Sequence, residues 1–152
     1  MTRLAVPYWH VDAFADRLFG GNQAAVMPLD EWLADETLQA IGAENLFAET
    51  AFVVPDSTGE ADWELRWFTP EVEIRLCGHA TLASGYVLLG RDGGERVTFR
   101  TRKAGVLEVR RIDRGYELAL PVIPTAPISC EFQGAGSSER ETSSAPLVTV
   151  AK

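Results

Sequence analysis

The feature that most constrains the fold is a stretch without charged side chains, HATLASGYVLL at residues 79–89. A helix that is apolar around its whole circumference lies inside a protein and not on its surface. Small residues in the stretch, namely Ala80, Ala83, Ser84 and Gly85, would let neighbouring strands approach closely. We therefore expect the chain to fold around a central buried helix.

The segments on both sides of this helix have strand patterns. The stretch ADWELRWF, residues 61–68, alternates between apolar and charged residues. Trp63, Leu65 and Trp67 fall on one predicted face of the strand. Asp62, Glu64 and Arg66 fall on the other. The short connections RKAG and DRG predict that the last three strands form an antiparallel meander. The predicted strands are Ala5–Phe14, Ala24–Leu29, 50–54, 61–68, Arg96–Thr101, Val106–Ile112 and Tyr116–Val122.

A second helix is predicted in DEWLADETLQAIGAENL, residues 30–46. Its acidic start suits a helix N-terminus, and Leu33, Thr37, Leu38 and Ile41 recur at helical intervals, as in an amphipathic surface helix. One buried helix, one surface helix and at least six strands indicate an α+β fold, in which a curved antiparallel sheet wraps around a helix.

Length and composition exclude several classes of protein. The 152 residues suit a single domain, and a net charge of −8 argues against nucleic-acid binding, which needs a basic surface. No stretch approaches the roughly 18 apolar residues of a membrane span, and the first residues do not resemble a signal peptide. Two cysteines do not make a disulfide framework. We expect a cytoplasmic protein with no membrane or nucleic-acid partner.

The Pro/Ser/Gly-rich tail, residues 123–152, is predicted to be low-complexity and poorly ordered.

The segment RLCGHATLASGY, residues 75–86, leaves several interpretations open. Cys77 is either a small core residue or a thiol activated by a helix N-terminus, and His79 is either a capping residue or part of a site. A metal site is not expected, because the chain has only two His and two Cys. The unpaired amides of Gly78, His79 and Ala80 predict instead a site that binds a substrate carboxylate.

Two further motifs carry candidate site residues. Glu49, in ENLFAETAFVV, follows the predicted surface helix and precedes an apolar strand. A carboxyl group at the mouth of an apolar cavity can exchange a proton near neutral pH, although most glutamates are simply exposed. The glycines and Asn22 of FGGNQAAV predict a turn that presses against another element or a ligand. Neither a dinucleotide fingerprint nor a P-loop occurs.

Taken in order, VDAFADRLFGGNQAAV, ENLFAETAFV and RWFTPEVEIRLCGHATLASGYVL resemble the N-terminal half of the PhzF-type phenazine-biosynthesis proteins. The resemblance runs from about residue 5 to about residue 122, so we assign 1–122 to a PhzF-like half domain. It implies the diaminopimelate-epimerase-like fold, with two halves that each wrap a barrel-like antiparallel or mixed sheet around a central helix. The implied activity is a cofactor- and metal-independent isomerase or epimerase acting on a small carboxylated metabolite.

The resemblance also implies roles for individual residues. Glu49 falls on the family's acid/base glutamate, Gly78 and His79 on its substrate-binding helix start, and Asn22 on the asparagine of its Gly-Asn turn. Cys77 occupies the place of an acid/base cysteine in the related diaminopimelate epimerases, which makes it a secondary candidate.

The chain departs from the family pattern in two ways. Leu46 and Ala48 stand where members often have asparagine and serine. Nothing matches the acidic motif of the family's second half, so we expect activity only when a homodimer or a complementing chain supplies that half. The alternative interpretation is a half-protein that acts as a non-catalytic dimerisation or binding module.

Overall fold

The structure is a computed structural model that describes residues 5–121 and 148–151. Within these residues, two helices and nine strands follow one another along the chain. They are β1 (Trp9–Ala13), β2 (Asn22–Pro28), α1 (Asp35–Asn45), β3 (Glu49–Pro55), β4 (Trp63–Phe68), β5 (Glu73–Ile74), α2 (Gly78–Asp92), β6 (Arg96–Thr101), β7 (Val106–Ile112), β8 (Gly115–Ala119) and β9 (Val148–Ala151).

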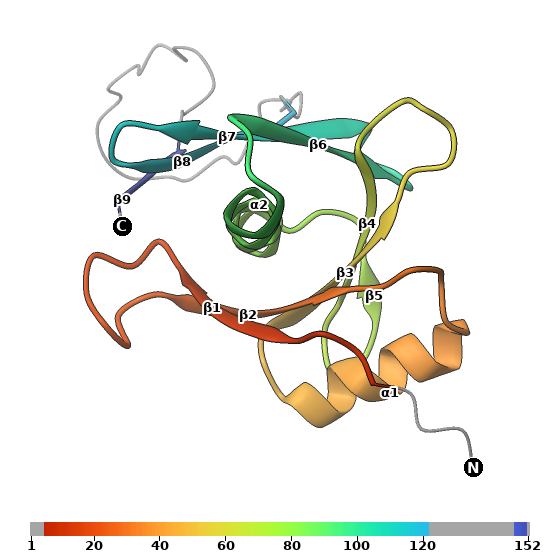
Figure 1. The fold of residues 1–152 in the computed structure, drawn as a ribbon. Coiled ribbons are helices and arrows are strands. Elements are labelled where there is room, and N and C mark those ends of the chain that lie inside the picture. The colour runs from red at the N-terminus through yellow and green to blue at the C-terminus, as the bar shows by residue number, and fades with distance from the viewer. Residues whose placement is uncertain (1–4, 122–147, 152) are drawn as a thin grey trace, which may run out of the picture.

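All strands belong to one curled sheet of order β1-β2-β3-β4-β6-β7-β8-β9, with β5 paired to β4. The sheet curls around α2, so that β1 and β2 lie on one side of this helix and β6, β7 and β8 on the other (Figure 1). Two pairs are parallel, β2 with β3 and β4 with β6. Parallel pairing requires a long crossover connection, and in each of these pairs that connection contains a helix. The α+β fold, a barrel-like mixed sheet around a buried helix, is therefore confirmed.

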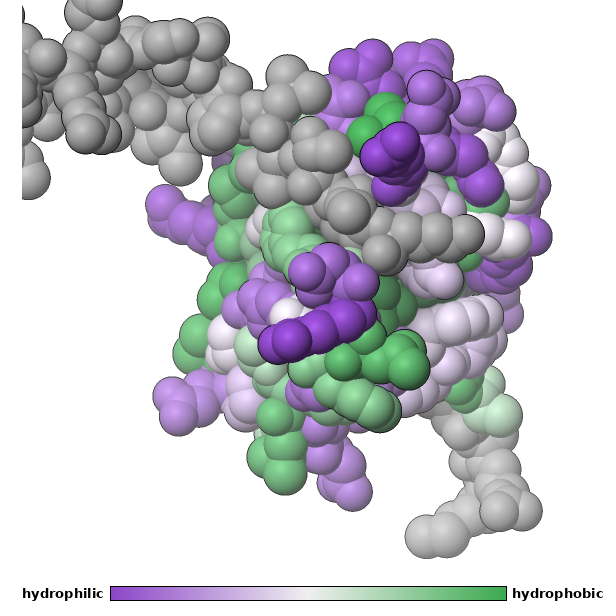
Figure 2. Space-filling view, turned by 90° about the vertical axis from the view of Figure 1, so that its left-hand side faces the viewer, coloured by the Kyte–Doolittle hydropathy of each residue, from purple (hydrophilic) through white to green (hydrophobic). Residues whose placement is uncertain are grey.

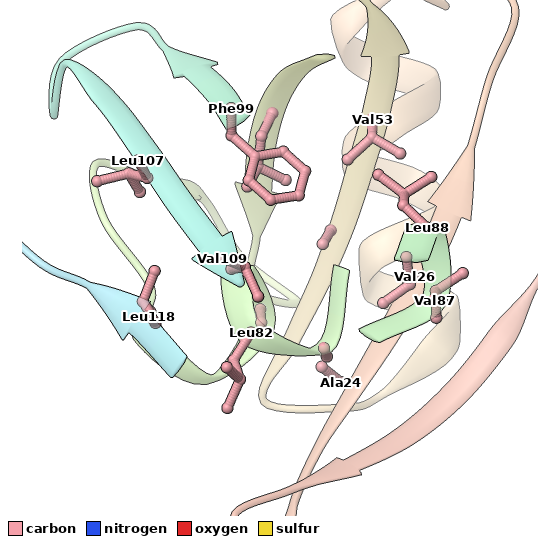
Figure 3. Close-up of a cluster of buried hydrophobic side chains, with 14 of the residues drawn as sticks. Ala24, Val26, Val53, Leu82, Val87, Leu88, Phe99, Leu107, Val109 and Leu118 are labelled. Atoms are coloured by element: carbon pink, nitrogen blue, oxygen red, sulfur yellow. The ribbon is translucent and has the colours of Figure 1, made fainter. Parts of the chain in front are cut away.

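Helix α2 forms the centre of the hydrophobic core. From Ala80 to Leu89 every residue is buried except Tyr86, which is 48% exposed. Side chains from opposite arms of the sheet contact this helix, with Val26 and Val53 on one side and Val109 on the other (Figure 3). The uncharged pattern of the sequence thus marks a helix that is enclosed around almost its whole circumference.

Helix α1 lies outside the curled sheet, below β3 and β4 in Figure 1. Two acidic residues in its first turn favour the helix N-terminus, and its buried residue Leu38 packs into a second cluster with Phe52 and Phe68. The helix ends at Leu46, whose φ of 56° lies in the left-handed region. This helix shields the outer face of the sheet and leads directly into β3.

The charged face predicted for residues 61–68 is only partly exposed. Arg66 is 2% exposed, with its guanidinium over the rings of Trp32 and Phe68, and it forms two hydrogen bonds of 2.8 Å to Glu73. Arg66 also lies 3.0 Å from Asp35 at the start of α1. Since a buried guanidinium must be paired, these carboxylates connect β4, β5 and α1.

Several predicted boundaries are wrong, and most of these errors have a cause in the backbone. β1 begins at Trp9 and not at Ala5, and Pro7 would stand opposite Pro28, where neither residue has an N–H to donate. The surface helix begins at Asp35 and not at residue 30, because Ala34 has the extended angles φ −58° and ψ 143°. β8 ends at Ala119, two residues before another proline.

The C-terminal tail is described only in part. Val148–Ala151 pairs antiparallel with β8, a strand that the composition of the tail does not predict. Residues 122–147 and 152, which include Cys130, lie outside the described residues. In the part of the chain that the structure describes, no helix has the length and apolarity to cross a membrane.

Candidate active site

The candidate residues come together where three elements meet: the N-terminus of α2 and the first residues of β2 and β3. The parallel register of β2 and β3 places Ala24 beside Glu49, so the residue before Ala24 lies close to the start of β3. Helix α2 enters the curled sheet at this point and brings Cys77 and His79 to it. Residues far apart in sequence therefore share one site.

Glu49 and His79 form the centre of this site. The Nε2 atom of His79 lies 3.0 Å from Oε2 of Glu49, and the two side chains are only 10% and 17% exposed. Although this distance is short, its geometry is not that of a hydrogen bond, and Oε2 has no hydrogen-bond partner among the described residues. Nε2 instead lies 3.3 Å from the carbonyl oxygen of Gln23, with hydrogen-bond geometry. Glu49 thus presents a buried carboxyl oxygen that has no hydrogen-bond partner among the described residues and faces the imidazole of His79.

Cys77 lies on the other side of the same imidazole ring. Its Sγ is 3.3 Å from Nδ1 of His79, and the residue is 6% exposed. Burial raises the pKa of the Cys77 thiol to about 12, and the nearby Glu49 carboxylate adds to this effect. The amides of Ala80 and His79 oppose it only in part, since they would hydrogen-bond a thiolate. Cys77 is therefore a protonated thiol at neutral pH, which disfavours a role as nucleophile.

The backbone at the start of α2 supplies hydrogen-bond donors. Its first helical hydrogen bond runs from the Thr81 amide to the Cys77 carbonyl, 3.2 Å away, so the amides of Gly78, His79 and Ala80 have no acceptor within the helix. Gly78 and His79 are partly exposed, whereas Ala80 is fully buried. The predicted use of these three amides to bind a carboxylate remains a prediction.

The backbone of the FGGNQ motif, residues 19–23, shapes the start of β2 beside the site. A Cβ built at Gly21 would lie 2.5 Å from the carbonyl oxygen of Ala13, so only glycine permits this close approach of β1 and β2. Asn22 is the exposed first residue of β2, and its role in binding substrate stays a prediction. Gln23, whose carbonyl oxygen contacts His79, cannot be recognised from the sequence, because a backbone acceptor leaves no mark on residue type.

A further contact near the site, between two aromatic rings, is not predicted by the sequence. The ring of His10 on β1 packs on Phe47, two residues before Glu49, with 4.5 Å between the ring centres. This contact attaches the segment between α1 and β3 to β1. The aromatic residues of both segments are visible in the sequence, but their proximity follows only from the sheet order.

A cleft of about 550 Å³ lies beside this site, between β1 and the region of β8. Leu82, Ala83 and Tyr86 of α2 line it together with β1 and the loop that follows β1, whereas Glu49, Cys77 and His79 do not. Figure 2 views this side of the molecule and shows hydrophobic residues exposed among polar ones. The cleft and the cluster of Glu49, Cys77 and His79 are thus both adjacent to helix α2 without sharing lining residues.

Glu49, Cys77 and His79 also form a set of potential metal ligands, with one donor atom each within 4.8 Å of the others. Their arrangement does not suit one ion, because Cys77 is close to Nδ1 of the imidazole and Glu49 to Nε2. A metal ion coordinates one of these nitrogens, so the ring would have to turn before all three residues could bind the same ion.

Comparisons with known proteins identify the family. The model of the PhzC-PhzF family, phenazine biosynthesis-like proteins, matches residues 11–147. An uncharacterized isomerase of Pseudomonas aeruginosa is 52% identical over 124 residues, which are 80% of this chain and 46% of that protein. A human phenazine biosynthesis-like domain-containing protein is 40% identical over 131 residues, 82% of this chain and 45% of that protein.

Solved structures agree with these matches. A PhzF-family protein of Enterococcus faecalis superposes with a TM-score of 0.70 at 41% identity, over 80% of this chain and 49% of that one. A PhzF-family protein of Bacillus anthracis gives a TM-score of 0.65 at 30% identity, over 76% and 40% of the two chains. The chain thus spans about half the length of the curated relatives that it matches. By its sequence and its fold, the chain belongs to the PhzC-PhzF family of phenazine biosynthesis-like proteins.

Proposed function

We propose that this chain provides the acid/base half of a cofactor-independent isomerase or epimerase that moves a proton on a small carboxylated metabolite. The observation that supports this proposal is the buried Glu49 carboxylate beside His79, with Oε2 and Nε2 3.0 Å apart, at the N-terminus of α2. The relatives named isomerases support the same reaction class.

In this mechanism, Glu49 removes a proton from a carbon next to a carbonyl or unsaturated group. The electron pair of the broken C–H bond moves into that group, and Glu49 then returns a proton to another position of the substrate. The proton on the carboxyl group exchanges with solvent before it is returned, so in D₂O deuterium enters the product. General acid–base catalysis of this kind contributes about 10²–10⁴-fold in rate. The imidazole ring of His79, held by the Gln23 carbonyl oxygen, would form the surface against which substrate lies beside Glu49.

The N-terminus of α2 would hold the substrate. The amides of Gly78, His79 and Ala80 have no acceptor within the helix, and the positive end of the helix dipole favours a carboxylate. An anion bound here would place its neighbouring carbon close to Glu49. Asn22, at the start of β2, would contribute a polar side chain from the opposite element.

A second half would complete the site. The chain spans about half the length of its relatives, and Phe14, Leu18 and Phe19, which follow β1 near the cleft, are 42%, 85% and 93% exposed. Large exposed apolar side chains grouped on one face mark interaction surfaces. We propose that this face receives either a complementing chain or a second copy of this one, and binding without catalysis is the alternative function.

Hydrogen exchange tests the proposal directly. The chain is incubated in D₂O with a panel of small amino- and hydroxycarboxylates, alone and with a separately expressed C-terminal half of the Pseudomonas relative, and deuterium entry is followed by NMR. The full-length relative identifies the substrates that exchange. We expect deuterium to enter these substrates in the presence of the second half, and Glu49→Gln to slow this entry about 10²–10⁴-fold.

A matched variant controls for loss of charge. Glu44 is an exposed glutamate of α1 close to the end of that helix, and Glu44→Gln should leave the exchange rate unchanged. Equal exchange in Glu49→Gln and the wild type would refute the acid/base role of Glu49. Absence of exchange in every combination, with substrates that the full-length relative does exchange, would instead support the binding module.

A further inference from the structure

The imidazole of His79 is held at both nitrogens. Nε2 has hydrogen-bond geometry to the carbonyl oxygen of Gln23 at 3.3 Å, and Nδ1 lies 3.3 Å from Sγ of Cys77. A carbonyl oxygen can only accept a hydrogen bond, so Nε2 must carry a proton. In a neutral imidazole Nδ1 then has a lone pair and needs a donor. Cys77 is the group at that position.

The surroundings of Cys77 keep it in the donating form. The residue is 6% exposed at the N-terminal end of α2, and burial raises the pKa of its thiol to about 12. The titratable groups on this site are Glu49 from β3, Cys77 before α2 and His79 in its first turn, whereas β2 contributes the uncharged Gln23 carbonyl. Glu49 disfavours a negative sulfur, so for a neutral ring one arrangement satisfies both contacts: S–H to Nδ1, and Nε2–H to the carbonyl.

We propose that Cys77 is a positioning residue, whose S–H donates to Nδ1 of His79 and holds this imidazole as the Nε2–H tautomer facing Glu49. The partner on one ring nitrogen decides which tautomer and which orientation the other nitrogen presents. The cysteine thus acts through His79 and contacts neither substrate nor reacting atoms. Its catalytic consequence rests on the proposed function, whereas the tautomer itself does not.

¹⁵N NMR of the His79 imidazole determines its tautomer, and the measurement needs no substrate. The chain has two histidines, so in ¹⁵N-labelled protein His10→Gln leaves the signals of His79 alone. We expect one protonated nitrogen, Nε2, and one unprotonated nitrogen, Nδ1, at neutral pH. Cys77→Ser keeps a donor and should preserve this pattern. Cys77→Ala removes the donor, so both neutral tautomers should be populated. The ¹⁵N chemical shifts of Nδ1 and Nε2 should then become more similar.

Two results would overturn the proposal. The first is a proton on Nδ1 of His79 in the wild-type chain, and this measurement needs no Cys77 variant to fold. The second is a Cys77→Ala spectrum identical to that of the wild type.

The deuterium-exchange assay separates this proposal from the proposed function. Cys77→Ala should slow exchange about 10- to 100-fold through misorientation of His79, and Cys77→Ser should retain most of the rate. An acid/base thiol predicts instead that serine fails as fully as alanine, which would contradict a positioning role. If the NMR pattern holds while no substrate exchanges, the positioning role stands and the isomerase proposal fails.

Discussion

Two glycines of helix α2 make opposite predictions for the same substitution. Replacing glycine by alanine inside a helix normally raises stability by about 0.5–1 kcal/mol, because alanine loses less backbone entropy on folding. Gly90 is exposed, and a Cβ built on it meets nothing within 4 Å. Gly90→Ala should therefore raise the free energy of unfolding by about that amount.

Gly85 faces the core, and there the same change should destabilise the protein. A Cβ at this position would overlap the side chain of Val109 on β7. Val109 is fully buried, and β7 is fixed by its pairing with β6 and β8, so this side chain has little room to move. Overpacking a core costs about 1–3 kcal/mol. After the gain in helix propensity is subtracted, we expect Gly85→Ala to lower stability by about 1–2 kcal/mol.

A double-mutant cycle identifies the cause of this loss. Val109→Ala alone removes buried methyl groups and should cost about 2 kcal/mol. It also creates the space that the new Cβ needs, so Gly85→Ala in that background should no longer destabilise, a coupling of about 1–2 kcal/mol. Urea denaturation followed by tryptophan fluorescence measures each step, since Trp67 lies in the core. Additive effects, or equal effects of Gly85→Ala and Gly90→Ala, would refute the close contact between α2 and β7.

Two further predictions concern the C-terminus of α1 and the carboxyl group of Asp56. Leu46 ends α1 in the left-handed region, where a residue with a Cβ loses about 1–2 kcal/mol and asparagine is better tolerated, so Leu46→Asn should raise the urea midpoint whereas Leu46→Ala should not. Hydrogen bonds from Thr58 and then from Arg100 hold the pKa of Asp56 well below its ordinary value of 3.8. The unfolded chain therefore takes up this proton first, and the stability that Asp56 contributes is present above pH 3.8 and lost as the pH falls below it. Asp56→Asn should flatten the decline of the unfolding free energy in that range, and an unchanged pH profile would contradict this role.

The fold was largely predictable because its main signal is local. The absence of charge in residues 79–89 identifies a buried helix, and the short turns after β6 and β7 define the meander. The parallel pairs were not predicted, since pairing partners separated by a helix leave no periodic pattern in either strand. Arg66 shows the same limit: its alternation with Trp67 predicts a solvent-facing side chain, and only the positions of Glu73 on β5 and Asp35 at the start of α1 make it a buried ion-pair partner.

The candidate site shows how much of its chemistry depends on those unpredicted pairs. Resemblance to the family selected Glu49 and His79 as residues, and both lie at the same point of the structure. Their relation depends on β2 and β3 being parallel and in a register that sets Ala24 beside Glu49, because this register places the Gln23 carbonyl where it can hold Nε2 of His79. An antiparallel pairing would reverse the direction of β2 relative to β3 and would not keep both in this arrangement. The candidate site is therefore a product of the sheet topology as much as of its motifs. The same topology encloses Cys77, for which the sequence left two interpretations open, as a buried thiol 3.3 Å from Nδ1 of His79.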